Sequence, residues 1–277
     1  MRLSLACAVL ALASCGGSGD GGTQPTAGTD VVSQIQSAAT GMNYGLKIYL
    51  PPGYGSGAGR YPVIYAMDGE DDDGYSRYPV LRDALLHGPY NDRVILVAIN
   101  SISGPRRFVD YPMPGAAHYY QFLTTELIPM IDAQYRTDPA NRTLSGHSLS
   151  AEFVYFALYM EPPAHRNFSA FISEECTCWA DSNYHYVGNW SVPATMQQQM
   201  VAASASLPVK FAASGDDQSN YVQSHAVYQS LVKLNLAGLQ SQFRSYNLGH
   251  TGMDEPAFSD SLAFVFGPVH QSTAPVK

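Results

Sequence analysis

Apolar residues along this chain fall into short continuous or alternating runs, and stretches with helical periodicity lie between them. Continuous apolar runs bounded by turn residues are typical of strands buried on both faces of a sheet. Strands that alternate with helices favour a mostly parallel sheet covered by helices on both faces. The predicted strands cover 43–50, 62–67, 93–99, 142–148, 168–173, 208–214 and 240–248, and the predicted helices cover 78–86, 116–135, 149–159, 221–236 and 255–266.

One long segment, roughly 174–205, shows no regular pattern and lies between two predicted strands. It contains Trp179, Trp190, Tyr184 and Tyr186. Long insertions of this kind often form a lid or a pocket wall. We therefore expect Trp179 to line a substrate pocket.

Composition predicts one large globular domain and argues against one class of partner. The chain has 277 residues, of which 45% are hydrophobic, and its formal net charge is -8. Its longest basic run is the pair Arg106 and Arg107, whereas nucleic-acid binding needs a clustered basic surface. We therefore expect no nucleic-acid partner, and we expect a monomer.

The first thirty residues have the pattern of an export signal followed by a tether. Arg2 precedes a short apolar run that cannot span a bilayer. The sequence L-A-S-C that ends at Cys15 resembles a bacterial lipobox, which implies cleavage of residues 1–14 and lipidation of Cys15. Residues 15–30 are then a flexible tether, and 31–277 the catalytic domain. We expect a membrane-anchored lipoprotein in the periplasm or at the cell surface; the alternative is an ordinary secretory signal.

Two cysteines remain once Cys7 is removed and Cys15 is lipidated: Cys176 and Cys178. Export permits their oxidation, but a C-x-C disulfide closes a strained ring. We expect free thiols here, and a disulfide is the second choice. A metal site would need more ligands at suitable spacing than the nearby His185 supplies, so we expect no metal.

The motif Gly146-His147-Ser148-Leu149-Ser150 lies between a predicted strand and a predicted helix. This is the context in which G-x-S-x-G forms a nucleophile elbow, and it makes Ser148 the expected nucleophile. Ser150 stands where the final glycine belongs. We expect Ser150 to bond back to a helix carbonyl and to widen the elbow slightly, and His147 to pack beneath the turn.

A nucleophilic serine needs a base and a group that orients the base. In an α/β-hydrolase these follow in the order serine, acid, histidine. Asp216 and Asp217 come after the strand at 208–214, and His250 lies between glycines after the last strand. We expect His250 to be the base and Asp217 the acid, with Asp216 as the alternative; either aspartate could instead cap the next helix.

Two backbone N–H groups are needed to stabilise an oxyanion. We expect them at Leu149, which follows the nucleophile, and at Glu70, which follows the strand at 62–67. The acidic run 70–73 is either a solvated loop or an attractor for a cationic substrate or a divalent ion.

Several further segments resemble the putative-esterase family of α/β-hydrolases, which includes siderophore esterases, S-formylglutathione hydrolases, feruloyl esterases and mycolyltransferases. The resemblance implies an α/β-hydrolase fold with an eight-stranded, mostly parallel sheet and an insertion between strands 6 and 7. It covers almost all of the mature domain. The matching segments are 46–54, 61–69, 122–129, 135–137 and 142–149.

The segment that begins at Arg107 resembles the R-x-x-D/E-Y segment of the siderophore-esterase branch. The likeness implies that Arg107 faces the pocket and holds an anionic or catecholate group; the alternative is a structural pair with Asp110. Residues 174–179 depart from the S-P-S-x-W-W sequence of the relatives. Because that segment helps to form the pocket, the substrate of the relatives cannot be carried over.

These residues predict a serine esterase that forms an acyl-enzyme on a small-molecule or polymer-borne ester and needs no cofactor. An acyltransferase with the same residues is the first alternative. The second is a non-catalytic binding protein on a hydrolase fold, which the changes at Ser150 and at 174–179 would favour. The aromatic insertion also suits a carbohydrate-ester degrader.

Overall fold

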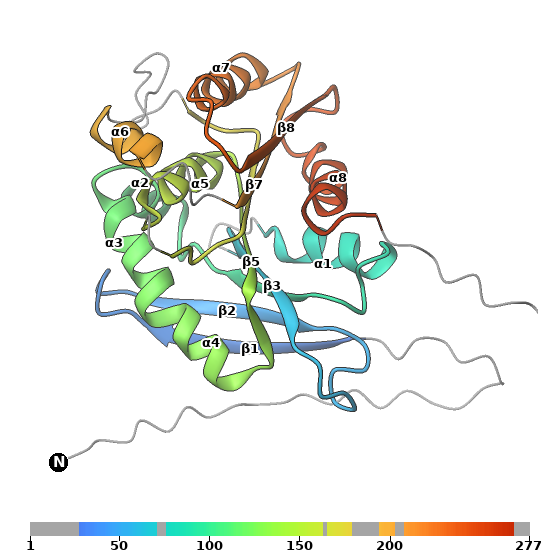
Figure 1. Ribbon diagram of the computed structural model, residues 1–277. Coiled ribbons are helices and arrows are strands. Elements are labelled where there is room, and N and C mark those ends of the chain that lie inside the picture. The colour runs from blue at the N-terminus through green and yellow to red at the C-terminus, as the bar shows by residue number, and fades with distance from the viewer. Residues whose placement is uncertain (1–27, 71–75, 163–164, 179–193, 203–207, 269–277) are drawn as a thin grey trace, which may run out of the picture.

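An open sheet of eight strands carries the fold, in the order β1-β2-β4-β3-β5-β6-β7-β8 (Figure 1). The computed structural model describes residues 28–70, 76–162, 165–178, 194–202 and 208–268. β2 is antiparallel to both of its neighbours, and β3 to β8 are parallel to one another. The strands are β1 (Thr29–Gln36), β2 (Asn43–Leu50), β3 (Tyr61–Met67), β4 (Ile95–Ile99), β5 (Thr137–His147), β6 (Ala170–Glu174), β7 (Val209–Asp216) and β8 (Leu239–Tyr246).

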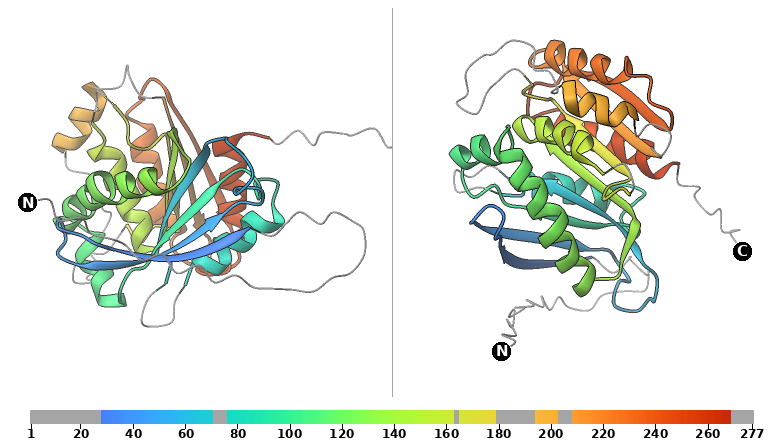
Figure 2. Two further views of the ribbon diagram at one scale, coloured as in Figure 1. Left: turned by 90° about the horizontal axis from the view of Figure 1, so that it is seen from below. Right: turned by 60° about the vertical axis from the view of Figure 1, so that its left-hand side comes forward.

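Helices cover both faces of the sheet, as the fold prediction requires. α1 and α8 lie together on one face, and the remaining helices lie on the other (Figure 1). The right view of Figure 2 brings that larger helical layer forward. The helices are α1 (Tyr78–His87), α2 (Gly104–Asp110), α3 (Gly115–Gln121), the π-helical turn η1 (Phe122–Leu127), α4 (Ile128–Gln134), α5 (Leu149–Met160), α6 (Ala194–Ala202), α7 (Tyr221–Val232) and α8 (Asp254–Phe266).

The central strands are apolar throughout because both of their faces are buried. In β4, Ile95, Val97 and Ile99 face one hydrophobic cluster, and Leu96 and Ala98 face the other. This division follows from the alternation of side chains along a strand.

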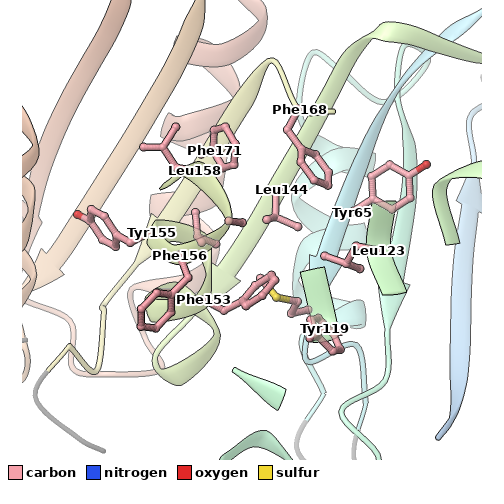
Figure 3. Packing of buried hydrophobic residues seen from close by; sticks show 14 of the residues in the cluster. Tyr65, Tyr119, Leu123, Leu144, Phe153, Tyr155, Phe156, Leu158, Phe168 and Phe171 are labelled. Atoms are coloured by element: carbon pink, nitrogen blue, oxygen red, sulfur yellow. The ribbon is translucent and has the colours of Figure 1, made fainter. Parts of the chain in front are cut away.

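α5 is the innermost helix, and every residue from Leu149 to Tyr159 is buried. Figure 3 shows Phe153, Tyr155 and Phe156 of this helix among aromatic side chains from the strands and from α3. The ring of Phe153 meets that of Tyr119 edge to face, with centroids 5.1 Å apart. Because α5 is enclosed on all sides, the helix and the turn that precedes it are held firmly.

Three elements were not predicted from the pattern. β1 begins at Thr29, inside the expected tether, and its residues alternate between exposed and half-buried because it lies at the sheet edge. α2 and α6 are short, and α6 lies inside the segment predicted to be irregular.

In the described part of the chain, no helix combines the length and apolar character needed to cross a membrane.

Candidate active site

Ser148 lies at the turn between β5 and α5, in a strained backbone conformation. Its φ is 61° and its ψ is -120°, a region that non-glycine residues rarely adopt. Its N–H donates to the carbonyl of Glu174 at 2.9 Å, and its carbonyl accepts the N–H of Thr177 at 3.1 Å. A Cβ atom at Gly146 would lie 2.4 Å from the carbonyl oxygen of Ser150, so the turn requires glycine there. The sequence motif therefore forms the geometry of a nucleophile elbow.

The serine that replaces the final glycine of the motif makes a buried bond across the site. Ser150 Oγ lies 2.7 Å from Asp68 Oδ2 and 2.9 Å from the carbonyl oxygen of His147. A hydroxyl has one proton, and the carboxylate is the stronger acceptor. The proton therefore lies toward Asp68, a contact that was not predicted. The expected bond back to a helix carbonyl is not what forms here, because the nearby carbonyl belongs to His147 at the end of β5.

Asp68 is fully buried and follows β3, with a φ of 59°. Arg107 Nε and Nη2 donate to its two carboxylate oxygens, each at 2.9 Å, and the Tyr111 hydroxyl donates to Oδ1 at 3.0 Å. The Arg107 side chain, expected to face the pocket, is 17% exposed and pairs with this carboxylate. The alternative pair with Asp110 is not found either, because Arg106 makes that contact.

The loop after β8 places His250 beside the elbow. The ring of His147 packs against that of His250 with centroids 4.8 Å apart, and His147 Nε2 lies 2.8 Å from the His250 carbonyl oxygen. Burial lowers the pKa of His147 to about 4, so the ring is neutral at pH 7 and its Nε2–H donates to that carbonyl. His147 therefore lies beneath the turn as expected, and it also anchors the His250 loop.

Neither aspartate expected to be the acid bonds to the His250 ring. The side chain of Asp217 is exposed. The carboxylate of Asp216 accepts the N–H of Leu248 at 2.7 Å and that of Gln218 at 2.9 Å. Asp216 thus joins the end of β7 to the loop that carries His250. The expected contact of Asp217 or Asp216 with the His250 ring is therefore corrected.

The carboxylate that does approach the ring belongs to Glu175, directly after β6. Its Oε1 is 3.4 Å from His250 Nδ1, and Ser219 Oγ is 3.2 Å from the same nitrogen. Glu175 is fully buried, whereas the His250 side chain is 38% exposed. Two successive glutamates at the end of a buried strand were the sequence signal for a carboxylate near His250.

Ser148 Oγ lies 2.9 Å from Thr177 Oγ1. Within the described ranges it has no hydrogen bond to the His250 ring.

Thr177 is buried and lies between Cys176 and Cys178, which form a disulfide with their Cα atoms 5.2 Å apart. The preference for free thiols was therefore wrong, because the turn after β6 brings the two sulfur atoms together.

A buried ion cluster fixes the strand end beneath the site. Arg77 Nη2 donates to Glu174 Oε2 at 2.6 Å and to Asp254 Oδ1 at 2.7 Å. All three side chains are 5% exposed or less. Arg77 directly precedes α1, and the two acids belong to β6 and α8, so the cluster joins three elements behind the loop that carries His250.

The two expected oxyanion donors, Leu149 and Glu70, lie just after Ser148 and Asp68, which both have positive φ. Leu149 is the first residue of α5, directly after Ser148, and Glu70 is two residues after Asp68. The Glu70 side chain pairs with Lys47 at 2.9 Å. Trp179, Asp71–Asp73, Cys15 and His185 lie outside the described residues. The residues that the structure describes contain no group of three or more His, Cys, Asp or Glu side chains suited to a metal ion.

The family model described as "Putative esterase" matches residues 37–251, which is more than half of the chain. This chain belongs to that esterase family. A curated relative, the uncharacterized protein YbbA of Bacillus subtilis (strain 168), is 25% identical to the esterase over 131 residues, which are 42% of this chain and 50% of the relative. The match thus spans half the length of that relative.

Solved structures share the fold of the esterase at low identity. The IroE-like serine hydrolase of Shewanella oneidensis matches with a TM-score of 0.65 and 21% identity, over 85% of this chain and 79% of its own. The siderophore hydrolase EstA of Aspergillus nidulans matches with a TM-score of 0.67 and 16% identity, over 85% of this chain and 93% of its own. Both confirm the predicted α/β-hydrolase fold.

Proposed function

We propose that this esterase hydrolyses carboxylic esters through an acyl-enzyme formed on Ser148, with His250 as the general base. The observation that carries the proposal is the strained turn at Ser148, which lies between a buried strand and the N-terminus of a buried helix. Such strain persists only where the surrounding structure enforces it, and it occurs most often at functional sites. The family match over 37–251 includes both residues.

In the first step Ser148 Oγ attacks the ester carbonyl carbon while His250 accepts the serine proton. The tetrahedral intermediate collapses, the C–O bond to the alcohol breaks, and the imidazolium returns its proton to the leaving alkoxide. Water then attacks the acyl-enzyme with His250 again as base, which releases the acid. No step requires a metal or an organic cofactor.

The oxyanion would be held by the N–H groups of Leu149 and Glu70. Leu149 is the first residue of α5, so its N–H points out of the positive end of that helix. Glu70 belongs to the loop that Asp68 anchors. Both donors would then stabilise charge that develops only as the ester carbonyl is attacked.

Catalysis requires one rearrangement at the nucleophile. Ser148 Oγ lies 2.9 Å from Thr177 Oγ1, so the serine hydroxyl must turn toward His250 for proton transfer. Rotation about one side-chain bond is fast compared with ordinary enzymatic turnover. We therefore treat the contact with Thr177 as a resting arrangement.

The substrate class is proposed no more narrowly than carboxylic esters, carried by a small molecule or a polymer. The siderophore-like segment gives little support for an anionic substrate, because Arg107 pairs with Asp68. We keep Trp179 as a proposed pocket residue. Product analysis with and without an added alcohol would separate hydrolysis from acyl transfer.

A fluorescent phosphonate probe and a panel of p-nitrophenyl esters of different acyl length test the proposal together. The wild-type protein should be labelled on Ser148 and should hydrolyse at least one ester. Ser148→Ala should lose both properties, and Ser245→Ala, which alters an exposed serine on β8, should keep both. Undiminished hydrolysis by Ser148→Ala would refute the nucleophile. A folded wild-type chain that the probe does not label would favour a binding protein.

We also propose export and lipid anchoring through Cys15, on the strength of the L-A-S-C sequence. Expression in a bacterium fed an alkyne-tagged fatty acid tests this directly. The wild-type chain should carry the tag and partition with membranes. Cys15→Ala should lose the tag, whereas an untagged, secreted wild-type chain would indicate an ordinary signal peptide.

A further inference from the structure

The segment that follows β6 supplies a carboxylate to His250 from an unexpected strand. Glu175 has a φ of 54°, in the left-handed region. Asp68, with φ 59°, and Ser148, with φ 61°, are two more of the five non-glycine residues of positive φ in the described ranges. The three residues follow three neighbouring strands, β3, β5 and β6, and such conformations persist only where the surrounding structure enforces them, most often at functional sites.

The Glu175 carboxylate is held on both of its oxygen atoms by backbone donors. The N–H of Asn220 donates to Oε1 at 2.7 Å, and the N–H of Asp216 donates to Oε2 at 2.6 Å. Oε1 also faces His250 Nδ1 at 3.4 Å. The donors come from the end of β7 and the start of α7, so the carboxylate is fixed in place before any substrate binds.

Glu175 is ionised at neutral pH despite its complete burial. Burial by itself would raise its pKa, but hydrogen bonds from His250, Ser219 and two backbone N–H groups lower it below the ordinary value for glutamate. A charged carboxylate beside Nδ1 favours the tautomer with hydrogen on Nδ1. That tautomer leaves Nε2 free to accept the serine proton.

We propose that Glu175 is the positioning carboxylate of this site, which orients His250 and stabilises its imidazolium, in the role expected of Asp217 or Asp216. This rests on the proposed function of Ser148 and His250. When His250 accepts the serine proton on Nε2, the Nδ1–H stays on the ring and donates to Glu175 Oε1. The proton returns to the leaving alkoxide, and Glu175 is never protonated.

Asp217 provides the matched control, because it is the acid expected from the sequence and it follows β7 directly. Asp217 is exposed, and Asp216 uses its carboxylate to hold the backbone of the His250 loop. Other titratable groups among the described residues that interact electrostatically with His250 are His147 of β5, Asp216 of β7 and Asp254 of α8. These stay unchanged in a Glu175 variant.

The test compares Glu175→Gln and Glu175→Asp with Asp217→Asn in the full chain, using an ester that the wild-type protein hydrolyses. Glu175→Gln should lower kcat by on the order of 10²–10⁴-fold with KM nearly unchanged. The acid limb of its kcat/KM profile against pH should move to lower pH, because the variant lacks the anion that stabilises the protonated ring. Asp217→Asn should match the wild-type protein in both measurements.

Glu175→Asp covers the case in which the glutamine variant folds poorly. It keeps the charge on a shorter side chain, so it should restore part of the kcat and return the acid limb toward the wild-type position. A purely structural role would lower the amount of active enzyme, as titrated by the phosphonate probe, without moving that limb. Inactive Ser148→Ala together with a fully active Glu175→Gln would overturn this inference alone. So would an acid limb that moves in Asp217→Asn and not in Glu175→Gln. Active Ser148→Ala would overturn the proposed function itself.

Discussion

Ser150 Oγ donates to Asp68 Oδ2 across 2.7 Å, and this bond joins the turn at Ser148 to the loop that carries Glu70, the proposed second oxyanion donor. Both residues are fully buried. In the usual motif a glycine at this position allows close packing between helix and strand. Here the serine hydroxyl occupies that space and binds a carboxylate. The residue that departs from the motif therefore makes a hydrogen bond that glycine could not make.

Ser150→Gly restores the G-x-S-x-G motif and should nevertheless lower both the stability and the activity of the protein. It removes a buried hydrogen bond to a charged acceptor, so we expect the free energy of unfolding to fall by about 1–3 kcal/mol. Activity should fall as well, because Asp68 is then less firmly held beside Glu70. Urea unfolding and ester kinetics measure the two effects.

Ser150→Ala is the matched control, because it removes the hydroxyl and keeps the Cβ atom. If the absence of glycine at position 150 lowered the activity, Ser150→Gly would be more active than the wild-type protein and Ser150→Ala would not. We expect both variants to be impaired to a similar extent.

Arg107→Met should destabilise the fold through the charge it leaves behind. Asp68 is fully buried, and loss of the guanidinium partner costs on the order of 3 kcal/mol for a buried pair. The double variant Arg107→Met with Asp68→Asn should recover much of that stability, because it leaves no buried charge unpaired. If Arg107 instead recognised substrate, the single variant would keep its stability and would raise KM for anionic esters only.

The sheet and the positions of Ser148 and His250 follow from local patterns, which is why the sequence could predict them. Continuous apolar runs specify buried strands, and the motif specifies a turn between strand and helix. β1 was missed because it is an edge strand: only Val31 and Ile35 pack on the core, and its other residues are polar or exposed.

The acid could not be predicted because its identity depends on backbone direction at one residue. Asp216 and Asp217 follow a strand, and so does Glu175; the sequence does not show which side chain the turn aims at His250. The left-handed φ of Glu175 and its two backbone donors are what support the proposal that Glu175 takes this role. The disulfide depends on the same turn.

Thr177→Val should not reduce catalysis and should favour it modestly. The Ser148 and Thr177 hydroxyls are 2.9 Å apart, and this contact must break before Ser148 can turn toward His250. Valine keeps the shape of threonine and removes that partner. One hydrogen bond contributes about 0.5–1.5 kcal/mol, so the rate of phosphonate labelling of Ser148 should rise by about 2- to 12-fold. A rate that falls tenfold would show that Thr177 supports the reaction instead, for example by holding the oxyanion.

His147 should make stability depend on pH in the acidic range. Its pKa is about 4 in the folded protein because burial disfavours the charged ring, against 6.5 for an ordinary histidine. Between these values the unfolded chain binds more protons than the folded one. The stabilisation is therefore full above about pH 6.5 and is lost as the pH falls toward 4, by about 3 kcal/mol in total.

His147→Gln isolates this effect, because glutamine keeps an N–H donor for the His250 carbonyl and does not titrate. Urea unfolding at intervals from pH 4 to 7.5 should show a wild-type stability that falls more steeply on acidification than that of the variant. Glu161, whose pKa burial raises to about 7, titrates in the same range but is common to both chains. Equal slopes for the two proteins would mean that His147 binds a proton as readily in the folded state as in the unfolded chain. That outcome would contradict a neutral His147 ring that donates to the His250 carbonyl.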